Sequence, residues 1–120
     1  MEGKKQDKKI AGVVKTMSEI PAEEVKSHEG FLARTLLELS KKDVLIKLTR
    51  VGPGGRGPVP PHSHPDGHLF IVLEGTLGLE MDGHLHRVEN GSCAEVPPGS
   101  THQLRCIGEK EIKFLAIKWI

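Results

Sequence analysis

Four histidines stand where their side chains could share one metal ion. His62 and His64 are two residues apart in HSH, and an extended strand would present both imidazoles on one face. His68 begins the next apolar stretch, and His102 begins a later one, shortly after PPGS. Neutral imidazole suits Zn, Cu, Fe, Ni or Mn better than Ca or Mg. These four positions therefore predict a site for one divalent transition metal, provided that the fold brings them together.

No other pattern in the sequence points to chemistry of comparable specificity. A Ser/His/Asp set, a phosphate-binding loop and a paired-carboxylate signature are all missing from the sequence. His84 and His86 form a second H-x-H without partners at matching spacing, so we expect exposed hairpin residues. His28 lies in an irregular N-terminal region and receives the same interpretation. Cys93 is expected to be buried in the core.

The elements that carry the four histidines are expected to be strands. From Phe31 onward, aliphatic and β-branched stretches are separated by Gly, Pro, Asp and Asn, as in an antiparallel barrel or sandwich. FLARTLLEL and VLIKLTRV flank a predicted SKKD hairpin turn, and Asp82-Gly83 and Asn90-Gly91 are typical of tight turns. GPGGRGPVPP is too rich in Gly and Pro for a regular central strand and is expected to be a loop. Helix is expected only as one turn in SEIPAEEV, begun by Ser18.

Length, charge and cysteine content limit the classes of protein. The 120 residues suffice for one hydrophobic core, and we expect a partly flexible, lysine-rich N-terminal arm (1–24) followed by a single barrel domain (25–120). A net charge of +1 argues against nucleic acid or an anionic membrane as a partner. Two cysteines make no disulfide framework, and no apolar run is long enough to span a bilayer. We therefore expect a cytoplasmic protein.

The segment around the first three histidines resembles the first motif of the cupin family. That motif contains H-x-H, then a glutamate three or four residues later, six further residues and a glycine. PPHSHPDGHLFIVLEG supplies His62, His64 and Gly75 at this spacing, preceded by Gly57. The usual glutamate position holds His68 instead. With histidine at this position, the segment is similar to a subgroup of small single-domain cupins that carry H-S-H-P-x-x-H. That subgroup is of the four-histidine, manganese-binding type.

The second cupin motif, G-x5-P-x-G-x2-H-x3-N, resembles GSCAEVPPGSTHQLRC. Gly91, Pro97, Gly99 and His102 match, and Cys106 replaces the final Asn. The resemblance covers about residues 25–118 and implies an all-β, cupin-type antiparallel barrel, the jelly-roll or double-stranded β-helix. It also implies that the glycines and Pro97 shape turns rather than bind a ligand. Since small cupins commonly associate through sheet edges, a homodimer is expected, with KFLAIKWI and Trp119 as one contact; a closed barrel strand would give the same pattern.

The side chains expected around the metal follow from alternation along the strands. Phe70 and Val72 share the face of His68, and Leu104 and Cys106 share the face of His102, so these four could line a dry pocket. Lys47 and Thr49 share one face of the strand before the Gly-rich stretch. If that face is the inner one, Lys47 could pair with a substrate carboxylate; the alternative is a solvated lysine at a strand edge.

Three functional classes follow from these observations. The first is a metal-dependent enzyme, with a dioxygenase-like oxygenase acting on a small organic molecule preferred over an isomerase or lyase. The second is a non-catalytic module that binds a small ligand, and the third is a storage or structural protein. Four neutral ligands leave the charge of the dication uncancelled, and six-coordination would leave two positions for substrate, water or dioxygen. We favour the enzyme, with Mn or Fe ahead of Zn, Ni and Cu.

Overall fold

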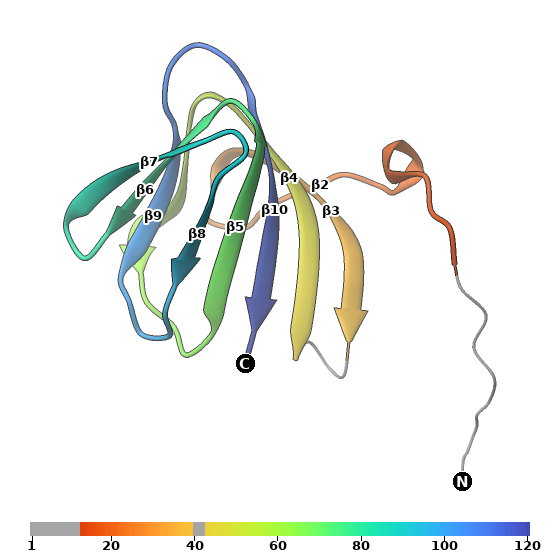
Figure 1. Cartoon of the computed structure of the whole chain (residues 1–120), viewed down its shortest axis with the longest axis horizontal. Coiled ribbons are helices and arrows are strands. Elements are labelled where there is room, and N and C mark those ends of the chain that lie inside the picture. The colour runs from red at the N-terminus through yellow and green to blue at the C-terminus, as the bar shows by residue number, and fades with distance from the viewer. Residues whose placement is uncertain (1–12, 40–42) are drawn as a thin grey trace, which may run out of the picture.

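The computed structural model describes residues 13–39 and 43–120 and is almost entirely β-structure (Figure 1). One short 3-10 helix, η1 (Met17–Glu19), precedes the sheet. The described residues form nine strands: β2 (Glu23–Glu24), β3 (Glu29–Leu39), β4 (Val44–His62), β5 (Gly67–Glu74), β6 (Thr76–Met81), β7 (His84–Glu89), β8 (Cys93–Val96), β9 (His102–Cys106) and β10 (Ile112–Trp119). The predicted all-β jelly-roll barrel is confirmed. The first ten residues, predicted to be a solvated arm, lie outside the described residues.

The strands form one antiparallel sheet that curves into a nearly closed barrel. Its order is β7-β6-β9-β4-β10-β5-β8, with β3 paired to β4 and β2 paired to β3. Figure 1 shows β6, β7 and β9 on one side of the barrel and β8, β5, β10, β4 and β3 on the other. The long strand β4 belongs to both sides, since it pairs with β10 through its first half and with β9 near its end. This strand therefore carries residues from the body of the barrel to its mouth.

The predicted tight turns are present where the backbone needs a positive φ. Asp82 and Gly83 have φ values of 50° and 86°, and they connect β6 to β7 in the register Met81↔His84. Two successive residues with positive φ are typical of a type I′ hairpin turn. Gly91 has a φ of 82° in the connection between β7 and β8. Both tight turns are confirmed, but only the first closes a hairpin, because β8 pairs with β5 and not with β7. The hairpin turn predicted in SKKD falls on residues 40–42, which lie outside the described residues.

The core lies between the two sides of the barrel. Its fully buried side chains come from alternating positions on several strands, and they include Val51, Val72, Leu77, Ile112 and Phe114. Alternation follows from the pleat of a strand, which points successive side chains to opposite faces. Leu48 and Arg50, in contrast, lie on the outward face of β4, beside Glu111.

The prediction of a loop for GPGGRGPVPP is wrong, because this segment forms the second half of β4. The segment is nevertheless irregular: the pairing of β4 with β9 joins Arg56, Gly57 and His62, with a register shift between Gly57 and His62. Pro58 and Pro60 fall inside that shift. Proline cannot donate to a ladder, and a break in register is where a strand accepts it.

The helical turn expected in SEIPAEEV is also misplaced. Helix η1 follows Thr16, not Ser18, and Glu23–Glu24 forms strand β2, which pairs with Leu32 and Ala33 of β3. Backbone pairing with β3 overrides the local preference of these residues for a helix start. Among the described residues, no helix is long and apolar enough to cross a membrane.

The C-terminal strand is not the free edge that the homodimer prediction used. Strand β10 pairs with β4 on one side and with β5 on the other, so its backbone groups are occupied within the chain. Trp119 packs against Gly67, where an added Cβ would lie 2.6 Å from the indole ring. The apolar pattern of KFLAIKWI is therefore explained by a closed barrel strand. The homodimer itself stays a prediction.

Candidate metal centre

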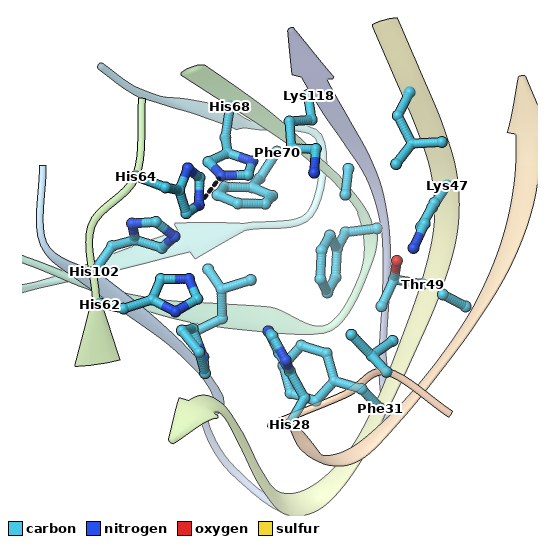
Figure 2. Close-up of a pocket in the computed structure, with 17 residues that line it drawn as sticks. His28, Phe31, Lys47, Thr49, His62, His64, His68, Phe70, His102 and Lys118 are labelled. Carbon is cyan, nitrogen blue, oxygen red and sulfur yellow. Dashed lines mark hydrogen bonds between the residues drawn. The ribbon is translucent and has the colours of Figure 1, made fainter. Parts of the chain in front are cut away.

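The four predicted histidines come together at one place in the structure (Figure 2). One ring nitrogen from each of His62, His64 and His102 lies within 4.8 Å of the others. His68 joins this group, because its Nε2 lies 2.9 Å from His64 Nε2. The ring centroids of His68 and His102 are 5.1 Å apart. Three imidazoles therefore form a group that could hold a metal ion, and the ring of His68 lies beside them.

The spacing between His64 and His68 fits two ligands of one ion. Imidazole nitrogens bind a transition metal at about 2.1 Å, so two nitrogens at right angles about the ion lie about 3.0 Å apart. A tetrahedral pair would lie about 3.4 Å apart. The observed 2.9 Å between the Nε2 atoms is near the first value. Imidazole is a suitable ligand for Fe, Ni, Cu or Zn, so the residues present fit a transition-metal ion.

Backbone pairing between strands places the four histidines. His62 ends β4 and is paired with His102, the first residue of β9. His68 lies on β5, beside Val96 of β8. His64 lies in the connection between β4 and β5, and its carbonyl accepts a hydrogen bond from the Gly99 N–H at 2.9 Å. The turn PPGS is thereby tied to HSH, although the two segments are far apart in sequence.

One ligand nitrogen is selected by a backbone hydrogen bond. His102 is 4% exposed, and its Nδ1–H donates to the Ser100 carbonyl at 3.0 Å. This bond fixes the tautomer that leaves Nε2 unprotonated, as metal-binding histidines require. Asp82 holds the same turn, because its carboxylate accepts hydrogen bonds from the Ser100 hydroxyl at 2.7 Å and the Thr101 N–H at 3.1 Å. The orientation of His102 is thus fixed by the fold before any ion binds.

His64 has a buried nitrogen without a hydrogen bond. Its Nδ1 has no partner in the described part of the chain, and the nearest carboxylate oxygen, Asp66 Oδ2, is 3.9 Å away. Buried polar atoms are rarely left unpaired, and such atoms in folded proteins are often explained by an ion or a functional role. When Nε2 binds a metal, Nδ1 carries the proton, and Asp66 is positioned to attract it.

The surroundings keep three of the imidazoles neutral. Burial, followed by the neighbouring histidines His64 and His102, lowers the pKa of His68 to about 3. Burial also lowers the pKa of His62 and of His64 from the usual value of 6.5, with other histidines adding to the effect. Neutral imidazole is the form that binds a metal. The site is therefore ready for an ion at neutral pH without losing protons from these residues.

The histidines form one wall of a cavity of about 250 Å³ inside the barrel. Of the predicted pocket residues, Lys47, Thr49, Phe70 and Leu104 line it. Phe70 stacks on His68 with ring centroids 5.4 Å apart. The other lining residues are mainly apolar: Val25, Phe31, Ala33, Leu45, Pro58, Phe114 and Ala116, with His28 and Lys118. An apolar lining excludes water and strengthens electrostatic interactions within the cavity.

Two predicted pocket residues lie elsewhere. Val72 is 1% exposed but belongs to the core below the cavity, and Cys106 donates from Sγ to the Lys110 carbonyl at 3.1 Å. Val72 lies deeper along its strand than the cavity reaches, whereas Cys106 is the last residue of β9 and is partly exposed. Cys93, expected in the core, is exposed, because Ala94 and Val96 take the inward positions of β8. His84 and His86 are exposed, as predicted.

Residues 47–118 match the cupin family, described as a cupin domain. This chain belongs to the cupin family. A search of curated proteins finds no match for this cupin, but solved structures resemble it. The polyketide cyclase RemF from Streptomyces resistomycificus is 24% identical, with a TM-score of 0.79 over 90% of this chain and 79% of RemF. KdgF from Halomonas sp. is 17% identical, with a TM-score of 0.76 over 90% and 93% of the two chains.

A third similar structure is a predicted oxalate decarboxylase from Thermotoga maritima. It is 22% identical to this cupin, with a TM-score of 0.77 over 90% of this chain and 99% of the other. All three identities are below 25%, so these likenesses show the fold alone. The four-histidine, manganese-binding subgroup stays a prediction.

The glycines of the two cupin motifs have different roles in this structure. Gly75, Gly91 and Gly99 have φ values of 82°, 82° and 85°, which favour glycine, so their turn-shaping role is confirmed. Gly57 has another role: an added Cβ there would collide with the ring of His28. Glycine at this position leaves room for a side chain from the N-terminal part of the chain.

Sequence reasoning missed two polar residues of the cavity wall. His28, expected to be exposed, lines the cavity, packs edge-on to Phe31 at 4.7 Å, and points Nδ1 at the Lys26 carbonyl, 2.8 Å away. It precedes β3 and lies outside the residues matched to the family, so no motif marked it. Lys118 could have been found by alternation, since it shares the inward face of β10 with Phe114 and Ala116.

Proposed function

We propose that this cupin is a metal-dependent enzyme, a dioxygenase-like oxygenase that acts on a small organic substrate. Its ion would be one divalent transition metal held by His62, His64, His68 and His102, with Mn or Fe preferred. The observation that carries the proposal is the convergence of four imidazoles on the wall of an apolar cavity of about 250 Å³. A purely structural site would be closed and would need no cavity beside it.

The neutral ligand set supports a catalytic role. The family's usual glutamate would cancel one unit of the metal's charge, whereas His68 cancels none. A bound ion would supply Lewis-acid or redox chemistry to a substrate that enters its open coordination positions. The protein's own contribution is to fix the donors and to exclude water. Phe70 and Leu104 provide the apolar wall beside the imidazoles, and the Ser100 carbonyl holds the ring of His102.

A redox-neutral reaction is the second candidate function. Two of the similar structures are described as a polyketide cyclase and a predicted oxalate decarboxylase, and neither description names an oxygenase. Four neutral ligands produce an electrophilic ion, which would also suit an isomerase or a lyase that polarises a carbonyl. A non-catalytic module that binds a small ligand is the remaining alternative.

Oxygen consumption separates these candidates. Protein loaded with Fe(II), Mn(II) or Cu(II) would be mixed with diketones, catechols and thiols, while an electrode follows dissolved oxygen and chromatography follows the organic compound. An oxygenase consumes both together. Conversion without oxygen uptake would favour the redox-neutral enzyme. Binding without any conversion, across all the metals and compounds, would favour the binding module. The variant His84→Ala, outside the site, provides the matched control.

A further inference from the structure

The described residues on the cavity wall are cationic or neutral, and none of them is acidic. Two lysines, Lys47 and Lys118, line it together with the histidines, and no Asp or Glu among residues 13–39 and 43–120 does. A dication held by four neutral imidazoles would add two further positive charges. The ligand that fills this cavity therefore has to bring negative charge, because a low-dielectric site penalises uncompensated charge strongly.

The two lysines are not equivalent. Lys118 Nζ lies 3.5 Å from Asp66 Oδ2, so its charge has a partner within the protein. No carboxylate lies within ion-pairing distance of Lys47 in the described part of the chain. Lys47 is therefore the cation that remains to be balanced by something else.

Lys47 occupies an interior strand, not the exposed edge that would explain a solvated lysine. It is paired with Thr35 of β3 and with Ala116 of β10, and the small side chains Ala33 and Ala116 leave space beside it. Thr49, two residues along the same face, is 4% exposed and also lines the cavity. Figure 2 shows the Lys47 ammonium pointing toward the Thr49 hydroxyl, on the side of the cavity away from the four imidazoles.

We propose that Lys47 and Thr49 form an anion subsite, and that the cavity accepts a small organic molecule with two anionic ends. One end would bind the metal beside the imidazoles, and a carboxylate at the other end would accept hydrogen bonds from the Lys47 ammonium and the Thr49 hydroxyl. This inference rests on the proposed metal site, but it does not require a particular reaction. It makes Lys47 the residue that selects dianions over monoanions.

A matched pair of metal-chelating acids tests the subsite. The probes are 2-oxoglutarate and 2-oxopentanoate, which have the same chain length and differ in the distal carboxylate. Their affinities for Zn(II)-loaded protein would be measured by calorimetry, so that the result does not depend on turnover. The diacid is expected to bind at least tenfold more tightly, since hydrogen bonds to charged groups are among the stronger ones in proteins.

Three variants assign the preference to its residue. Lys47→Met should remove the preference to within twofold by weakening the diacid alone, and Lys47→Arg should retain most of it. Lys113→Met is the matched control, because that lysine pairs with Glu74 and does not line the cavity. Equal affinity of the two acids for the unaltered protein, binding of neither acid, or an unchanged preference in Lys47→Met would overturn the proposal. Elemental analysis of each sample shows separately whether the metal site itself has failed.

Discussion

Acidification is predicted to leave His68 neutral at pH values where most histidines are charged. The pKa of His68 is lowered to about 3 by burial and by the neighbouring rings of His64 and His102. At pH 5.0 a side chain with the ordinary pKa of 6.5 is about 97% protonated, whereas one with a pKa near 3 is about 1% protonated. Lowering the pH of the metal-free protein from 7.5 to 5.0 should therefore add almost no proton to His68.

The difference between the pKa of His68 and that of an ordinary histidine affects both metal binding and folding stability. An ordinary imidazole loses about 1.5 log units of metal affinity at pH 5.0 through competition with protons, and His68 should contribute almost none of that loss. The unfolded chain binds a proton at His68 below about pH 6.5, but the folded chain does so only near pH 3. The contribution of neutral His68 to the free energy of unfolding is therefore complete above pH 6.5, and it declines as the pH falls from there toward 3.

Nuclear magnetic resonance of histidine-labelled, metal-free protein measures this directly. The His68 ring signals, assigned by their loss in His68→Ala, should not titrate between pH 7.5 and 5.0, while a histidine in a short peptide serves as the reference. A His68 midpoint at or above pH 5.5 would show that burial among other imidazoles does not keep this side chain neutral.

The remaining predictions concern single substitutions. His68→Ala is expected to weaken metal binding at least tenfold. His68→Glu, which restores the usual cupin ligand, and the control His84→Ala should both retain metal binding. Metal titrations measure all three variants, and unchanged affinity in His68→Ala would remove His68 from the ligand set. Gly67→Ala places a Cβ 2.6 Å from Trp119, and such overpacking costs about 1–3 kcal/mol. Urea unfolding should show that loss for Gly67→Ala. The control Gly52→Ala, where nothing lies within 4 Å, should change the free energy of unfolding by less than about 1 kcal/mol. Equal stabilities of the two variants would contradict the packing argument.

The sequence predicted those features that depend on spacing within one strand or one turn. The two-residue period of a strand placed Lys47 and Thr49 on one face, and the structure shows that this face is the inner one. The same period placed Phe70 on the face of His68. Glycines in the sequence marked turns such as the one at Gly99, where the backbone of the structure has a positive φ. These features are local, because the geometry of a few bonded residues determines them.

Depth and long-range contacts could not be predicted in the same way. Alternation gives the face of a strand but not the distance along the barrel, so Val72 was assigned to the pocket although it belongs to the core below. His28 reaches the cavity because Gly57, far along the chain, has no side chain to obstruct its ring. Nothing in the spacing of either residue indicates that contact.

The proposed metal site consists of four imidazoles that hold one divalent transition metal. The most direct test is anomalous diffraction from crystals of the reconstituted protein, recorded at the absorption edge of the added metal, together with its elemental content. We expect about one equivalent of metal and one anomalous peak within bonding distance of His62, His64, His68 and His102. Less than a tenth of an equivalent after reconstitution, or a peak located away from these four side chains, would contradict the proposed site.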